Sequence, residues 1–166
     1  MFKIEVLKDG ISMIVVGYQG VGKSTLAGRD NKFIDLESGN FWVDGKRAED
    51  WYKPYCKIAE HLSQQGYIVF VSSHEVVRKQ LEDTKETIVV VYPSLKLKNE
   101  WLTKLEERYD RSGLEKDYKA LMNAEYKYEE NIKELSKSPF NLLELDNMYY
   151  DLESELIAFK NQMNNL

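Results

Sequence analysis

A phosphate-binding pattern stands close to the start of the chain. Residues 17–25 read GYQGVGKST and match Gly-x-x-x-x-Gly-Lys-Ser/Thr, directly after the apolar run at 13–16. Glycines at these positions let the main chain approach phosphate oxygens, so that successive N–H groups donate to them. The lysine adds a positive charge at the β- and γ-phosphates, and the hydroxyl after it binds Mg²⁺. The stretch therefore predicts a bound nucleoside triphosphate, with contacts from Gly17, Gln19, Gly20, Val21, Gly22, Lys23, Ser24 and Thr25.

The elements around this loop are those that the motif needs. A glycine-rich turn that only caps a helix is the alternative, but the loop lies between a predicted strand and a predicted helix. Nearly continuous apolar strands alternate with helices, which indicates a parallel sheet covered on both faces. We therefore expect a three-layer α/β/α P-loop NTPase fold, with a mostly parallel five-stranded sheet and a helical lid or arm. Strands are predicted at 12–16, 33–35, 67–71, 87–92 and 140–145, with an additional edge strand at 2–7, and helices at 23–29, 48–64, 75–81, 94–109, 114–135 and 149–163.

Bulk composition narrows the class of protein. The 166 residues, 43% apolar and 31% charged, suit one soluble domain spanning 1–166, without a membrane span or a secretory signal. The net charge of −5 gives no strong nucleic-acid signal. Cys56 is the only cysteine, which fits the reducing cytoplasm, and we interpret it as a small apolar helix residue rather than a nucleophile. The oligomeric state is left open.

Two common classes of nucleotide-binding protein lack their signatures here. A GTPase needs Asn-Lys-x-Asp after a late strand, whereas residues 31–35 read NKFID, which has the wrong spacing and the wrong place. A motor or helicase-type ATPase carries an acid at the end of its third strand. That strand here runs into VSSH at 71–74, and Glu75 comes only after it.

The acids stand instead at the second strand, in FIDLES at 33–38. A carboxylate at the carboxyl end of a strand beside the loop faces the ligand crevice of an open α/β sheet. Asp35 is placed to hold a magnesium-bound water or to accept a proton from an attacking hydroxyl. With Ser24 it is the predicted metal site. A surface acid that caps the next segment is the alternative, and it applies more strongly to Glu37.

In this region the chain resembles the P-loop kinases of small molecules, the nucleoside monophosphate kinase and shikimate kinase group. In shikimate kinases the second strand ends in Asp-x-Asp, which serves magnesium and the substrate hydroxyl. Asp35 matches the first aspartate, and Glu37 stands in place of the second. The triple glycine that those enzymes carry after strand three is replaced by Ser-Ser-His at 72–74. Both departures argue against shikimate as the acceptor.

The same resemblance covers the second half of the chain. In nucleoside monophosphate kinases a helix after strand four leads to a lid whose arginines close over the transferring phosphoryl group. Arg108 and Arg111 stand in the comparable helix and share one face of it, beside the break at 112–113. The resemblance implies that residues 99–136 form a lid or arm. The alternative is that both are surface arginines paired with the neighbouring acids Glu106, Glu107 and Asp110. The helix at 114–135 is open to interpretation as a partner surface or a solvated arm.

Residues 38–65 occupy the place of the acceptor-binding segment in this group. An aromatic ring beside an arginine suits a base and its phosphate, which points to Phe41, Trp42 and Arg47. Trp51, Tyr55 and Ile58 have helical spacing and are interpreted as packing residues. After strand three, Arg78 is placed to bind an acceptor phosphate. His74 is placed to bond a base or hydroxyl, with a structural role as its alternative.

These observations predict an ATP- and Mg²⁺-dependent kinase that phosphorylates a nucleotide or similar small acceptor, a nucleoside or deoxynucleoside monophosphate in particular. The expected catalytic residues are Lys23, Asp35, Arg108 and Arg111. The expected acceptor-binding residues are Glu37, Phe41, Arg47, His74 and Arg78. A nucleotide-binding regulatory or assembly protein with little or no ATPase activity is the alternative function.

Overall fold

The sheet of this protein is parallel throughout the part of the chain that the computed structural model describes, residues 11–165. Every hydrogen-bonded neighbour pair in it runs parallel. The α/β fold expected from the sequence is thus confirmed, while the predicted edge strand at 2–7 lies outside the described residues. The five strands follow the spatial order β2 (Phe33–Asp35), β5 (Ile68–Val71), β1 (Met13–Gly17), β6 (Ile88–Pro93) and β7 (Asn141–Leu145).

The three central strands β5, β1 and β6 are apolar along their whole length and buried on both faces. Val15 of β1 lies in register with Phe70 of β5 on one side and with Val89 of β6 on the other. Strands covered on both faces carry no polar alternation, because neither face meets water. This register brings the carboxyl ends of the central strands to one edge of the sheet.

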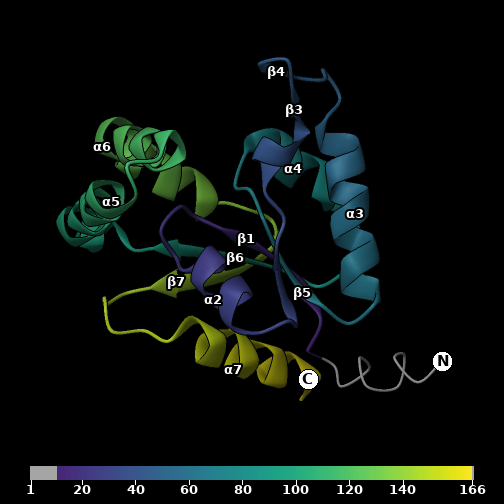
Figure 1. Ribbon diagram of the computed structural model, residues 1–166. Coiled ribbons are helices and arrows are strands. Elements are labelled where there is room, and N and C mark those ends of the chain that lie inside the picture. The colour runs from purple at the N-terminus through teal and green to yellow at the C-terminus, as the bar shows by residue number, and fades with distance from the viewer. Residues whose placement is uncertain (1–10, 166) are drawn as a thin grey trace.

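Helices cover both faces (Figure 1). Two of them, α2 (Lys23–Arg29) and α7 (Leu152–Asn164), lie along one face. The other face carries α3 (Tyr52–Gln64) and α6 (Glu115–Leu135), with α4 (Glu75–Gln80) beside α3 and α5 (Lys98–Ser112) beside α6. Among the described residues, no helix combines the length and apolarity that crossing a membrane requires. The shorter 3-10 segments are Ser38–Phe41, Leu81–Asp83 and Leu95–Leu97.

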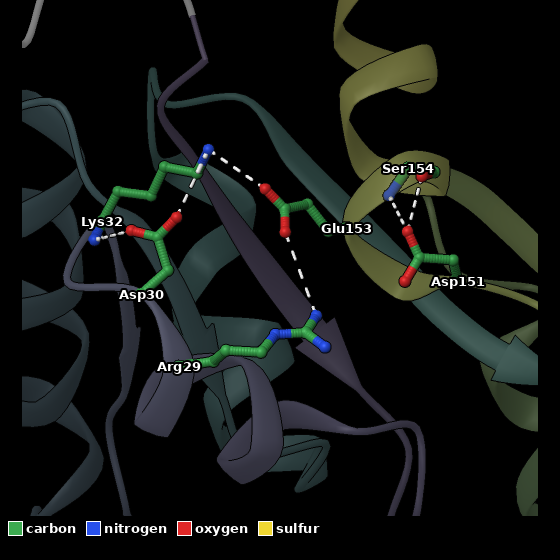
Figure 2. Close-up of polar contacts among 6 residues, drawn as sticks. All are labelled: Arg29, Asp30, Lys32, Asp151, Glu153 and Ser154. Atoms are coloured by element: carbon green, nitrogen blue, oxygen red, sulfur yellow. Dashed lines mark hydrogen bonds and ion pairs between the residues drawn. The ribbon is translucent and has the colours of Figure 1, made fainter.

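Charged contacts join α7 to the neighbourhood of α2 (Figure 2). Glu153 lies 3.2 Å from the Lys32 ammonium and 3.9 Å from the Arg29 guanidinium. Asp151 accepts a hydrogen bond from the Ser154 N–H at 3.1 Å, as an N-cap does. This cap explains why α7 begins at Leu152, three residues later than predicted. The half-exposed ion pairs add little stability by themselves and mainly orient the helix.

A small hairpin projects from the domain before α3. Its strands, β3 (Trp42–Val43) and β4 (Lys46–Arg47), are antiparallel and joined by two residues with positive φ, Asp44 (51°) and Gly45 (78°). Positive φ at both positions is the requirement of the tight hairpin turns whose twist matches the strands. The turn was expected, but the two strands were not, and α3 begins at Tyr52 instead of residue 48.

The helices α5 and α6 form an antiparallel pair joined at Gly113, whose φ of 64° ends α5 in the left-handed conformation. The apolar face of α6 is buried in the domain core, with Leu121, Ala124 and Tyr128 nearly inaccessible to solvent. The Tyr128 hydroxyl donates to the Ser94 carbonyl oxygen at 2.8 Å. Because one face of α6 packs in the domain core, the helix is part of the fold and is not a solvated arm.

Candidate active site

The phosphate-binding loop connects β1 to α2. Gly20 and Gly22 have φ values of 89° and 112°, and Gly22 is the N-cap of α2. The first N–H of α2 that bonds within the helix is that of Leu26, which donates to the Gly22 carbonyl oxygen at 3.1 Å. The N–H groups at 22–25 precede this bond, so they are the free donors of a helix N-terminus. This is the geometry that the motif predicts for holding phosphate oxygens.

Two aromatic side chains hold the loop from outside. Trp101 of α5 donates its indole N–H to the Gln19 carbonyl oxygen at 2.8 Å, and the Tyr150 hydroxyl donates to the Val21 carbonyl oxygen at 2.9 Å. Their rings stack with centroids 6.2 Å apart. Because these bonds engage carbonyl groups of the loop, they fix its orientation without using its N–H groups. Sequence reasoning missed both residues, and no local pattern marks them.

A cation also lies against this aromatic pair. The Lys104 ammonium donates to the Tyr150 hydroxyl at 2.9 Å and sits 4.4 Å from the Trp101 ring centroid. Burial lowers the pKa of Lys104 to about 8, and the charge of Arg108 one turn later adds to the shift. The support of the loop is therefore positively charged as well as aromatic.

Close packing at Gly20 leads to a stability prediction. A Cβ there would lie 3.0 Å from Leu105 Cδ2 and 3.0 Å from Trp101 Nε1, on a backbone that L-residues rarely adopt. We expect Gly20→Ala to lower the free energy of unfolding by about 1–3 kcal/mol, measured by urea denaturation. Gly28→Ala is the matched control, since Gly28 lies within α2 with nothing within 4 Å of its Cβ position. Equal stability of the two variants would contradict this account of the loop.

A cavity of about 810 Å³ opens at the carboxyl ends of β1, β2 and β5. In open α/β sheets this is the edge where ligands bind, and the volume is in the range of small-molecule sites. The structure brings Lys23 from the loop, Asp35 from β2 and Arg108 from α5 to its wall. The cavity is thus the point where the predicted donor-side residues meet.

The charges at this wall influence one another. Burial lowers the pKa of Lys23, and the nearby carboxylate of Asp35 opposes that shift. Burial also raises the pKa of Asp35, and Lys23 opposes that shift in turn. The positive charge of Arg108 adds to the shift of Lys23 and opposes the shift of Asp35. Lys23 and Asp35 are therefore poorly solvated and close enough to influence each other's pKa, and a bound phosphate with its metal ion would stabilise both charges.

The two arginines of α5 differ in placement. Arg108 is half-buried, lines the cavity and forms an ion pair from its Nε to Asp117 at 3.0 Å. Arg111 is exposed and is not part of the cavity wall. The described residues show no ion pair from either arginine to the neighbouring acids of α5 that the sequence offered as partners.

A second part of the cavity wall is aromatic and cationic. The Arg47 guanidinium lies 5.3 Å from the ring centroid of Trp42 and 4.2 Å from that of Trp51. His74 meets the edge of Trp51, with centroids 6.0 Å apart. Burial lowers the pKa of His74, and the charge of Arg47 lowers it further, so the imidazole is neutral at pH 7. Trp42, Arg47 and His74 all line the cavity. Phe41 is not in its wall and packs instead on Tyr55, with centroids 5.4 Å apart.

Side chains of α6 complete the enclosure and contact several predicted residues. Lys116 lies 3.3 Å from the Glu37 carboxylate, and Glu134 lies 2.8 Å from a terminal nitrogen of Arg78. The Gln19 side-chain amide donates to the Asn123 oxygen at 2.9 Å. The helix therefore contacts the loop, the segment after β2 and α4. Arg78 also donates from Nε to the Ser73 carbonyl oxygen at 3.0 Å, so two nitrogens of its guanidinium are engaged in hydrogen bonds within the protein.

Two side chains at the site, Ser24 and Asp35, offer oxygen ligands for a magnesium ion. Ser24 stands exposed in the first turn of α2, and Asp35 faces the cavity. No cluster of three or more acids, histidines or cysteines suited to a metal occurs within residues 11–165. A hydroxyl and one carboxylate fit Mg²⁺ better than most ions, because Mg²⁺ keeps several waters and takes further oxygens from substrate phosphates.

Cys56 is buried in α3, and burial raises the pKa of its thiol to about 12, so it is no nucleophile at neutral pH.

Comparison with known proteins gives partial matches. No family model matches the chain. An ATP-dependent lipid A-core flippase from Polaromonas sp. (strain JS666 / ATCC BAA-500) is 31% identical over 71 residues, which are 43% of this chain and 11% of the flippase. ABC transporter B family member 14 from Arabidopsis thaliana is 30% identical over 101 residues, 60% of this chain and 8% of the transporter. The chain thus spans only a small fraction of the curated relatives it matches.

Among solved structures, the shikimate kinase from Bacteroides thetaiotaomicron aligns with 91% of this chain and 97% of its own. The TM-score is 0.49 and the sequence identity 12%. At that distance the likeness assigns no activity, and the functional argument rests on the site itself.

Proposed function

We propose that this protein is an ATP- and Mg²⁺-dependent phosphotransferase that acts on a nucleotide or a similar small acceptor, with a nucleoside or deoxynucleoside monophosphate as the preferred class. One observation carries the proposal: a single cavity has groups for a transferring phosphate on one wall and groups for an aromatic, anionic acceptor on the other. A protein that only bound a triphosphate would need the first wall alone.

The donor wall supplies the contacts that phosphoryl transfer requires. The free N–H groups of the loop and the Lys23 ammonium hold the β- and γ-phosphates, and Ser24 and Asp35 offer oxygens to the magnesium ion that accompanies them. The flippase relative is ATP-dependent by its name, which supports ATP as the nucleotide. Bound Mg²⁺ supplies positive charge at the phosphate oxygens.

The transfer step requires an aligned acceptor oxygen and positive charges that stabilise the transferring phosphoryl group. An acceptor oxygen forms a bond to the γ-phosphorus while the bond from that phosphorus to the bridging oxygen of the leaving ADP breaks. Lys23 and Arg108 stabilise the charge on the transferring oxygens. Asp35 orients the acceptor, and it accepts the proton if the attacking group is a hydroxyl. A phosphate acceptor is already ionised and needs no base.

The acceptor wall suits a planar base with its own anionic group. Trp42 offers an aromatic ring, and Arg47 is a cation without a carboxylate partner among the described residues, close to the indole rings of Trp42 and Trp51. We assign acceptor binding to the segment 38–65 together with His74 and Arg78. We assign to the α6 side chains that line the cavity the role of limiting access of water once both ligands are bound, which would favour transfer to the acceptor over hydrolysis.

The proposal is tested by ADP release from ATP and Mg²⁺ against a panel of acceptors. The panel contains ribo- and deoxynucleoside monophosphates, nucleosides and shikimate. We expect release to depend on one of the nucleoside monophosphates and to be insensitive to shikimate. Tight ATP binding with no acceptor dependence across the panel would contradict the proposal and favour the regulatory alternative.

A further inference from the structure

A buried carboxylate lies at the junction of α5 and α6. The Asp117 side chain is only 5% exposed. Charged groups are rarely buried without a partner. Its partners are the Nε of Arg108, 3.0 Å from Oδ1, and the Ser112 hydroxyl, which donates to Oδ2. Nothing in the sequence pattern distinguishes Asp117 from the other acids of this helix pair.

The form of the Arg108 contact is informative. The ion pair joins the Arg108 Nε to Asp117 Oδ1 at 3.0 Å, so the carboxylate lies beside the Nε end of the guanidinium. Within residues 11–165, Asp117 is the one acid that forms an ion pair with Arg108. The two terminal nitrogens of a guanidinium form the edge that binds phosphate oxygens in pairs. Asp117 thus holds the guanidinium from its Nε side, while Arg108 also lines the cavity.

The junction of the two helices also has main-chain hydrogen bonds that do not involve this carboxylate. Gly113 N–H donates to the Tyr109 carbonyl oxygen at 2.7 Å, and Leu114 N–H donates to the Ser112 hydroxyl at 3.1 Å. The first turn of α6 is closed by the Asp117 N–H to the Leu114 carbonyl oxygen at 3.1 Å. Two of these bonds are between main-chain groups and remain if the carboxylate is replaced, and the charged partner of the Asp117 side chain is the cavity arginine.

We propose that Asp117 is a positioning residue that holds Arg108 by its Nε, so that the two terminal nitrogens face the γ-phosphate of a bound nucleoside triphosphate. Asp117 acts only through Arg108 and touches neither nucleotide nor metal. The inference rests on the proposed function to the extent that a triphosphate must bind in this cavity, but it does not require transfer to an acceptor.

A binding experiment separates this role from a structural one. Calorimetry with Mg²⁺ compares AMP-PNP, which carries a γ-phosphate group, with ADP, which does not. We expect Asp117→Asn and Arg108→Ala each to weaken AMP-PNP binding about tenfold or more, and ADP binding less than about threefold. The double variant should bind AMP-PNP no more weakly than Arg108→Ala, because the two residues act as one unit.

Asp110→Asn is the matched control, since this acid of α5 is exposed and has no ion pair within the described part of the chain. Thermal unfolding checks that each variant folds. If Asp117→Asn does not fold, Ser112→Ala replaces it, because loss of one hydrogen bond loosens the carboxylate without removing its charge. Equal losses for AMP-PNP and ADP, or additive effects in the double variant, would overturn the inference.

Turnover provides a second and separate measure. With the acceptor found for the wild-type protein, Asp117→Asn should lower kcat/KM for ATP by about 10- to 100-fold and leave the KM for the acceptor within about threefold. An unchanged kcat/KM for ATP would also overturn the inference. If the wild-type protein shows no acceptor-dependent ADP release but the AMP-PNP and ADP pattern holds, the proposed function fails and the role of Asp117 stands.

Discussion

Replacement of Lys23 by methionine is expected to lower acceptor-dependent ADP release by a factor on the order of 10² to 10³, the largest loss we anticipate from a single side chain. Lys23 is the cation of the loop, and its ammonium donates to the Gly17 carbonyl oxygen at 3.1 Å. Methionine preserves the length and packing of the side chain but not its charge. A coupled assay of ADP release at saturating ATP measures the effect.

The pH profile of the same variant gives an independent check. Because burial lowers the pKa of Lys23, the protonated form is lost at a lower pH than for an ordinary lysine. The activity that depends on it is present below this pKa and falls as the pH rises through it. The kcat/KM of the wild-type protein should therefore decline on the alkaline side, and Lys23→Met should lack that decline.

Lys127→Met is the matched control, because Lys127 is exposed on α6 and does not line the cavity. We expect wild-type turnover from it. A Lys23→Met protein with near wild-type turnover would contradict the assignment of the donor wall, since no other residue of the loop carries a positive charge.

Replacement of Asp35 by asparagine is expected to reduce turnover by about 10²-fold and to raise the Mg²⁺ concentration needed for half-maximal rate. Asparagine keeps the size of the side chain and one oxygen, but it removes the charge that attracts the metal. Since burial raises the pKa of Asp35, the ionised form appears only at a higher pH than for an ordinary aspartate. Wild-type activity should therefore rise with pH through that raised pKa, and the variant should lack this rise.

A magnesium titration at fixed ATP, run for both proteins, measures this effect. Asp83→Asn is the control, because Asp83 is exposed after α4 and away from the cavity. An Asp35→Asn protein that loses turnover without any change in its magnesium dependence would place Asp35 on the acceptor instead of the metal. Full activity in the variant would remove Asp35 from the mechanism altogether.

The fold was predictable from the sequence where burial leaves a continuous apolar signal. β1, β5 and β6 are apolar because they are covered on both faces, and the glycine-rich loop marks where β1 passes into α2. The hairpin β3–β4 was missed because strands of two residues carry no periodicity. The start of α3 was placed too early because the exposed residues before Tyr52 give no sign that separates turn from helix.

The candidate site was predictable only where a residue stands next to a recognisable motif. Trp101 and Gln19 are 82 positions apart, and Tyr150 and Val21 are 129 apart, so only the packed sheet and helices bring them together. The helix α5 shows what the sequence pattern could not predict. Spacing puts Arg108 and Arg111 on one face, but contact of Trp101 with the loop sets the rotation of the helix, and only Arg108 reaches the cavity.

The placement of the indole rings has a practical consequence. All three tryptophans of the chain touch the cavity or its immediate support: Trp42 lines it, Trp51 stacks on Arg47, and Trp101 bonds the phosphate-binding loop. Tryptophan fluorescence is therefore a built-in optical reporter of this protein. Under the proposed function, we expect nucleotide binding to change the fluorescence of Trp101, and acceptor binding to change that of Trp42 and Trp51. Single Trp→Phe variants separate the two signals, so that the order in which the two ligands bind can be followed without an attached dye.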